Sequence, residues 1–88
     1  MPKMHLGAKA PNEGARLLAR WMARETRGST RMAGRLLGTD ETVVQRMIDG
    51  DLIPGDQLGE TLFRIVRVDR LMFQRPAQAG WFAEAQAA

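Results

Sequence analysis

Residues 30–50 constrain the fold of this chain more than any other segment, because glycines divide them into two short helical stretches. Ala33, Leu36 and Leu37 lie at helical spacing and predict an apolar face for the first stretch. Gly38 follows them where a helix commonly ends. The segment therefore predicts two short helices that meet at a sharp turn.

The second of these helices has a start signal and a stop signal. Thr39 and Asp40 offer a side chain that can cap its first turn. Gly50 ends it, and Pro54 prevents a simple continuation. Its predicted buried face consists of Val43, Val44, Met47 and Ile48. Two helices joined by a short turn that contains glycine form a helix-turn-helix unit, whose second helix can enter the major groove of DNA.

The spacing of the small and apolar residues is more specific than the helical pattern. Val44 and Met47 follow Gly38 after six and nine positions, and Gly34 lies four positions before it. This pattern resembles the lambda-repressor-like (Cro/repressor) helix-turn-helix family, over roughly residues 14–72. The resemblance implies an all-α fold of four or five short helices, with a small residue where the two helices cross. The family usually has alanine there, so we expect Gly34→Ala to be neutral or mildly stabilising.

The chain divides into three parts. We predict a flexible N-terminal arm over residues 1–11, a helix-turn-helix domain over 12–73 and a C-terminal tail over 74–88. Asn12 predicts the N-cap of a first helix that extends to Gly28. No internal repeat and no convincing strand pattern occurs, which again favours an all-α fold.

The first helix and the region after residue 55 each combine an apolar face with arginines. Ala15, Leu18, Trp21 and Met22 predict a core face, whereas Arg16, Arg20, Arg24 and Arg27 predict a solvated or partner-facing stripe. Asp56 can cap a fourth helix, whose core face would consist of Leu58, Leu62, Ile65 and Val66. Residues 68–73 either continue this helix or form a short fifth turn.

Charge is distributed unevenly along the chain of 88 residues. The net charge is +6 over residues 1–38, −5 over 39–63 and +2 over 64–88. Clustered arginine is typical of phosphate binding. Arginine far exceeds lysine and alanine is abundant, which is also what coding with a high content of guanine and cytosine produces. The total charge leaves both explanations open, but its segregation favours a functional origin.

Several classes of function have no support in the sequence. The absence of cysteine excludes disulfide and thiolate chemistry, and no apolar run approaches the ~18 residues of a membrane span. The N-terminus lacks a hydrophobic signal core, so we expect a cytoplasmic protein. His5 has no second metal ligand at a suitable spacing, and no nucleophile–base pair is evident. We therefore expect no enzymatic activity, no metal site and no cofactor.

The resemblance implies which residues would contact double-stranded DNA. Base contacts would come from Glu41, Thr42, Val43, Gln45, Arg46 and Asp49, and phosphate contacts from Thr30, Arg31, Arg35, Arg64 and Arg67, with Arg70 as a further candidate. A glutamine can pair with adenine and an arginine with guanine through two hydrogen bonds each. The alternative is that these side chains form the ordinary solvated surface of their helices.

Carboxylates on the expected DNA-facing surface support a second hypothesis. Asp40, Glu41 and Asp49 would oppose a polyanion, although the first two also favour a helix N-terminus. The alternative function is a protein-interaction module of the same fold, such as a phage-type regulator or inhibitor of a host protein. The expected function remains a transcriptional regulator that binds DNA.

The tail contains two large apolar residues, Trp81 and Phe82, in a stretch that is otherwise rich in alanine and glutamine. Such a segment has too little apolar surface to fold alone. We expect the pair to form a homodimer contact or to bind another protein, rather than to pack on its own domain. Deletion of residues 77–88 would then leave the melting of the domain nearly unchanged.

Overall fold

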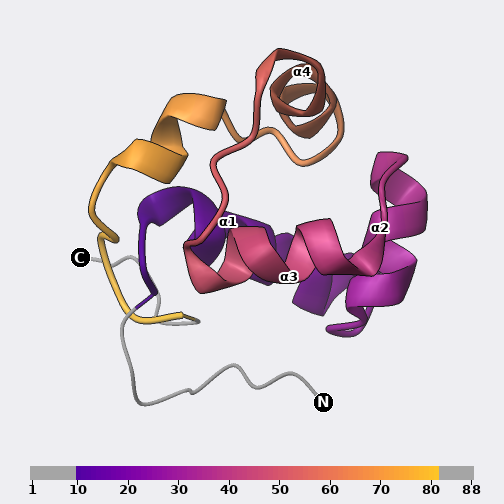
Figure 1. The fold of residues 1–88 in the computed structure, drawn as a ribbon. Helices are drawn as coiled ribbons and strands as arrows, with labels where there is room; N and C mark the ends of the chain where they lie inside the picture. Colours follow the sequence, from indigo (N-terminus) through magenta and orange to yellow (C-terminus); the bar gives the residue numbers. More distant parts are fainter. Residues whose placement is uncertain (1–9, 82–88) are drawn as a thin grey trace.

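The computed structural model describes residues 10–81, which fold into four α-helices and one 3-10 helix (Figure 1). The elements are α1 (Glu13–Glu25), α2 (Thr30–Leu37), α3 (Glu41–Asp49), α4 (Asp56–Ile65) and the 3-10 helix η1 (Arg70–Gln74). The prediction of an all-α fold is confirmed. The separate η1 also decides between the two alternatives for residues 68–73, because α4 ends before them.

Helix α1 lies at the centre of the fold. It contacts both α3 and η1, and α3 crosses in front of it in Figure 1. Helix α2 packs mainly against α3, and α4 contacts α2 and η1. The core includes Leu18, Trp21, Met22, Val44, Met47, Leu62 and Phe73. The predicted burial of Trp21, Val44 and Met47 is therefore confirmed.

Three helices begin with side-chain caps, two of which, at Asn12 and Asp40, the sequence predicts. The N–H of Ala15 donates to Asn12 Oδ1 at 2.7 Å, and the N–H of Val43 donates to Asp40 Oδ1 at 3.1 Å. Ser29 caps α2 by accepting from the N–H of Met32 at 3.0 Å. Each cap satisfies a backbone donor that has no partner inside its helix. These caps place the starts of α1, α2 and α3.

The start of α4 differs from its prediction. Gly55 holds the N-cap position without any side-chain hydrogen bond, and Asp56 is the first helical residue. Asp56 instead forms an ion pair with Arg70, in which Oδ1 and Nη1 are 2.8 Å apart. The aspartate therefore joins α4 to η1, although its negative charge still complements the N-terminus of α4.

The predicted end of α1 is also wrong, because the helix stops at Glu25, before Gly28. The Thr26 hydroxyl is buried and donates to the carbonyl of Met22 at 3.0 Å. The N–H of Gly28 donates to the same carbonyl at 3.0 Å, and Gly28 has a φ of +83°. Gly28 thus lies three residues after Glu25, the last helical residue, and its N–H closes the end of the helix.

Gly34 lies at the crossing of α2 and α3, which confirms its predicted position. A Cβ atom there would come within 2.9 Å of the carbonyl carbon of Asp40 and 3.1 Å of the N of Glu41. Both atoms belong to the backbone, so neither can move aside as a side chain would. The expectation that Gly34→Ala is neutral or stabilising is therefore wrong, because even a methyl group overpacks this contact.

Two predicted apolar faces are only partly buried. Leu36 is 49% exposed and Ile65 is 39% exposed, whereas Leu37 and Leu62 are buried. The three-residue spacing of Arg64, Arg67 and Arg70 predicts that they line one side of a single helix, and this prediction is wrong as well. Helix α4 ends before the second of these arginines, which has a φ of +68°, and the third belongs to η1.

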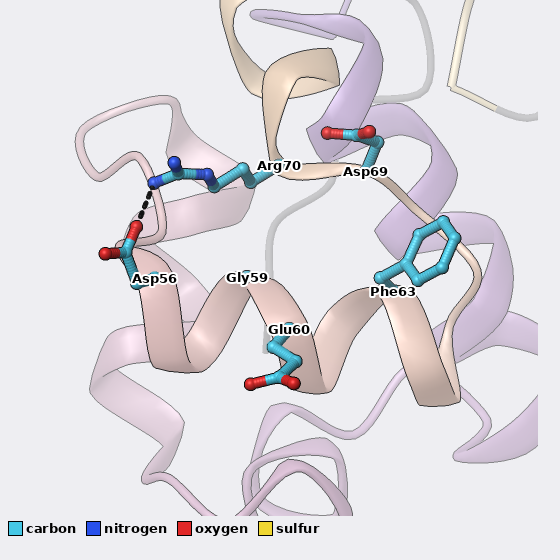
Figure 2. Close-up of a pocket in the computed structure, with 6 residues that line it drawn as sticks. All are labelled: Asp56, Gly59, Glu60, Phe63, Asp69 and Arg70. Atoms are coloured by element: carbon cyan, nitrogen blue, oxygen red, sulfur yellow. Dashed lines mark ion pairs between the residues drawn. The ribbon is translucent and has the colours of Figure 1, made fainter.

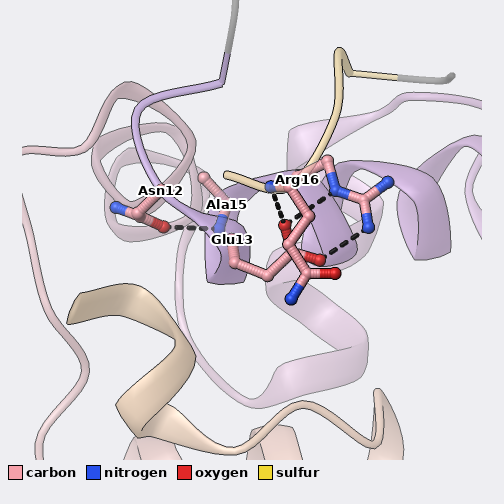
Figure 3. Close-up of polar contacts among 5 residues, drawn as sticks. Asn12, Glu13, Ala15 and Arg16 are labelled. Atoms are coloured by element: carbon pink, nitrogen blue, oxygen red, sulfur yellow. Dashed lines mark hydrogen bonds and ion pairs between the residues drawn. The ribbon is translucent and has the colours of Figure 1, made fainter. Parts of the chain in front are cut away.

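Arg16 is the clearest exception to the predicted solvated arginine stripe. Its side chain is 5% exposed and forms an ion pair with Glu13, whose side chain is 3% exposed, at 2.6 Å (Figure 3). Glu13 also accepts the backbone N–H of Gln78 at 2.7 Å. Burial raises the pKa of the Glu13 carboxyl, but the hydrogen bonds from Arg16 and Gln78 and the charges of Arg16 and Arg20 lower it by more.

Residues 77–81, here called the C-terminal strap, lie against the domain. Trp81 is 6% exposed and belongs to the core, and Gln78 is held by Glu13. The expectation that Trp81 forms a dimer or partner contact is therefore wrong, because this side chain is buried in the core of its own domain. Ala10, at the end of the predicted arm, is buried too. The predictions for His5 and Phe82 lie outside the described residues.

Candidate nucleic-acid interface

The α2–α3 unit consists of two helices joined by residues 38–40. Gly38 ends α2 with a φ of +73°, a left-handed conformation that glycine adopts without strain. The N–H of Thr39 donates to the carbonyl of Gly34 at 2.8 Å, and Asp40 then caps α3. Backbone hydrogen bonds and the close approach at Gly34 fix the angle between the two helices. The unit therefore presents α3 in one defined orientation.

Helix α3 divides into a buried face and an exposed face. Val44 and Met47 are 0% exposed and Ile48 is 4% exposed, so this side holds the helix on the core. The exposed side carries Glu41, Thr42, Arg46 and Asp49, whereas Gln45 and Val43 are partly buried. An α-helix with its side chains is ~10–12 Å across, which fits the ~12 Å width of the major groove.

Val43 is the predicted base contact that fits least well. It is partly buried and packs against the hydrophobic core. Only part of its side chain could meet a thymine methyl group. The structure therefore favours Thr42 and Arg46, which are exposed, as the outward-reaching side chains of α3.

The Gln45 amide is engaged within α3. Its Nε2 donates to Asp49 Oδ1 at 3.0 Å, one helical turn further along. This contact uses one of the two amide hydrogens and leaves the carbonyl Oε1 available as an acceptor. Asp49 therefore orients the Gln45 amide in the unbound protein.

Arg31 and Glu41 form a second contact across the unit. Arg31 Nε lies 3.5 Å from Glu41 Oε1, and the two side chains are 77% and 55% exposed. An exposed pair of this kind contributes only about 0–1 kcal/mol, so a phosphate can compete for the arginine. The pair also neutralises one of the carboxylates that would oppose a polyanion.

The remaining predicted phosphate contacts lie on two different elements. Thr30 is partly buried in the first turn of α2, and Arg35 is exposed near the end of the same helix. Arg64 is exposed in the last turn of α4, and Arg67 is exposed after the end of this helix, which contacts α2 but has no extensive contact with α3. The structure thus groups Arg31 and Arg35 on α2, whereas Arg64 and Arg67 belong to a different part of the chain.

The α2–α3 unit is electrically balanced. Residues 30–49 contain three arginines, at positions 31, 35 and 46, and three carboxylates, at positions 40, 41 and 49. Because log affinity falls with log salt by ~0.9 per phosphate neutralised, two arginines on α2 give a slope of about −2 per bound monomer. Such a unit would depend on base contacts more than on charge.

A groove between α4 and η1 is a feature that sequence reasoning missed (Figure 2). Its volume is about 400 Å³, and it is lined by Asp56, Gly59, Glu60, Phe63, Asp69 and Arg70. Gly59 has no side chain to fill it, and the stem of Arg70 crosses the glycine. Phe63 is the sequence feature that could have indicated this groove, because an aromatic residue on the polar side of an amphipathic helix indicates a contact surface.

Comparisons with protein-family models, with curated proteins and with solved structures find no match to this chain. Within residues 10–81, none of the helices combines the length and the apolar content that a bilayer crossing requires. The same residues contain no group of three or more histidine, cysteine, aspartate or glutamate side chains that could hold a metal ion.

Proposed function

We propose that this protein is a sequence-specific regulator of transcription that binds double-stranded DNA and has no enzymatic activity. Helix α3 enters the major groove, where Thr42, Gln45 and Arg46 contact base edges. Arg31, Arg35 and backbone N–H groups of α2 contact phosphates on either side. Bound protein then controls access of polymerase to the promoter.

The observation that carries this proposal is the presentation of α3. Its inner face is held on the core by Val44 and Met47, while Thr42 and Arg46 project from the opposite side. The turn at Gly38 and the crossing at Gly34 fix its angle to α2. A rigid helix with an exposed polar side is what direct readout of base edges requires.

A second candidate function is the binding of a basic protein through the same surface. The carboxylates at positions 40, 41 and 49 favour it, and two of them already bind the basic or amide groups that DNA would need. In this case α3 would present Asp49 and Glu41 to arginine or lysine side chains of the partner. The function would be regulation without direct DNA contact.

The discriminating experiment selects bound sequences from a random duplex library and then measures affinity for the best site. We expect enrichment of one motif and a log–log salt slope of about −2 per bound monomer. Recovery of no motif, together with equal affinity for all duplexes, would exclude sequence-specific readout and favour the protein-binding function.

Variants of single side chains then test the assignment of roles. Arg46→Ala should cost ~1–3 kcal/mol on the selected site and relax specificity at one base pair. Arg35→Ala should instead weaken all duplexes equally and reduce the salt slope by ~1. Arg24→Ala is the matched control, because this arginine is exposed on α1, outside the α2–α3 unit. Identical effects of Arg46→Ala and Arg35→Ala would show that α3 does not read bases.

A further inference from the structure

Helix α4 exposes a face that nothing in residues 10–81 covers. Phe63 is 55% exposed, and Glu60 and Arg64 beside it are exposed as well. At about 100° per residue these three positions share one side of the helix, opposite the inward Leu58 and Leu62. A large aromatic side chain at the centre of a charged helical face is typical of an interaction surface.

The charges on this face are arranged with opposite signs at its two ends. Glu60 lies one turn before Phe63, and Arg64 and Arg67 follow it. No ion pair joins Glu60 to Arg64 in the described part of the chain, although they are four residues apart on one helix. The acid and the base are therefore both available to another molecule.

The groove beside α4 leaves room at the aromatic end. Figure 2 shows the ion pair between Asp56 and Arg70 at one end of the groove, and Phe63 and Asp69 at the other. The stem of Arg70 fills the space over Gly59, so the first end is occupied from within the chain. The end at Phe63 can accept an apolar side chain from outside.

We propose that two copies of this chain associate through this face, with their α4 helices antiparallel about a two-fold axis. In this arrangement Phe63 of each copy packs against Phe63 and the groove of the other. Glu60 of each copy then lies opposite Arg64 of the other, because an antiparallel pair brings the acidic end of one helix to the basic end of the next. A two-fold contact needs a surface that is complementary to itself, and this pattern satisfies that requirement.

The size of the surface predicts a weak dimer. Helix α4 has ten residues and is therefore ~15 Å long, so its contact is smaller than the ~800 Å² per partner of a standard interface. Association would be visible at high protein concentration and would weaken with salt. It would be strengthened wherever two copies are held near each other on one DNA site.

Sedimentation equilibrium of the full chain without DNA tests this proposal, at protein concentrations up to about 1 mM because the interface is small. We expect the apparent mass to rise toward twice the monomer mass. Phe63→Ala should weaken association at least about tenfold. Leu36→Ala is the matched control, because this side chain is 49% exposed on α2 and should leave association unchanged. Circular dichroism of each variant checks that the fold is retained.

A charge exchange tests the antiparallel geometry itself. Glu60→Arg and Arg64→Glu should each make the protein monomeric, since each places like charges opposite one another at two symmetric positions. A mixture of the two variants should restore a heterodimer, because every facing pair is then opposite in sign.

The proposal is overturned if the wild-type chain stays monomeric over the whole range, or if the mixture of the two charge variants stays monomeric. It is also overturned if the surface variants and the α2 control behave alike. Because these measurements contain no DNA, their failure leaves the proposed DNA binding intact. Failure of the sequence selection likewise leaves this association intact.

Discussion

Removal of the Glu13 carboxylate should destabilise the protein strongly. Glu13 and Arg16 are both almost inaccessible to solvent and are 2.6 Å apart. In Glu13→Ala the guanidinium stays buried without its counter-charge, and the backbone N–H of Gln78 also loses its acceptor. Loss of one partner of a buried pair costs about 3–5 kcal/mol. A domain of this size has a total stability of only about 4–13 kcal/mol, so the variant should be close to unfolding.

Urea titration provides the assay, with fluorescence of the buried Trp21 and Trp81 as the signal. For an m-value of ~2 kcal/mol/M, a loss of ~4 kcal/mol lowers the midpoint by ~2 M. The double variant Glu13→Leu with Arg16→Met is the control and should lose less stability than Glu13→Ala, because it leaves no buried charge unpaired and only the Gln78 N–H lacks its acceptor. A loss below about 1 kcal/mol in Glu13→Ala would refute the reasoning, since such values are typical of exposed pairs.

The same carboxylate should give the stability a defined pH dependence. The pKa of Glu13 is lowered in the folded state, whereas in the unfolded chain it is ~4.3. The folded state therefore binds this proton less readily, so the stabilisation is complete above pH ~4.3 and is lost as the pH falls through the lower folded value. The difference in unfolding free energy between wild type and Glu13→Gln should shrink below pH ~4. A constant difference down to pH ~2 would contradict this linkage.

Three further substitutions test the packing. Gly34→Ala should lower the unfolding free energy by about 1 kcal/mol, because overpacking costs about 1–3 kcal/mol and the higher helix propensity of alanine offsets only about 1 kcal/mol of it. An unchanged or higher melting temperature would be inconsistent with the 2.9 Å approach of the Gly34 Cβ position to the backbone of Asp40. Trp81→Ala should lower the unfolding free energy by about 3–5 kcal/mol in chemical denaturation. A variant that loses its oligomeric state but keeps its stability would show that Trp81 belongs to an interface between chains. Val44→Asp should abolish cooperative melting through a buried unpaired charge, whereas Thr42→Asp, on the exposed side of the same helix, should melt as the wild type does.

The α2–α3 unit was largely predictable from sequence because its signals are local. Asp40, Gly38 and Gly50 each define a helix end through a hydrogen bond or a backbone angle that depends on nearby residues alone, as Asn12 does for α1. The periodicity of α3 likewise identified Val44 and Met47 as buried. Local capping and periodicity are the strongest signals that a single sequence contains.

The features that sequence reasoning missed depend on contacts between distant segments. The periodicity of α1 places Arg16 on a solvated stripe, whereas Arg16 is buried in an ion pair with Glu13, which accepts the N–H of Gln78, 65 residues along the chain. The same holds for Trp81, since a tail that is poor in apolar residues does not reveal a vacant site in the core. The consequence of Gly34→Ala was also mistaken, because helix propensity says nothing about the 2.9 Å approach of the next helix.

Variants can reduce the proposed DNA affinity in two ways, which the central position of α1 makes it possible to distinguish. Helix α1 contacts α3 and holds the strap through Glu13, which accepts the N–H of Gln78, so the strap supports the α2–α3 unit through α1 and the shared core. Changes at Glu13 or Trp81 should therefore act on affinity through the fraction of folded protein, and lower temperature or a stabilising osmolyte should restore that affinity. Changes at Arg46 leave the folded fraction intact, because this side chain is exposed, and no stabilising condition should restore the affinity that they remove.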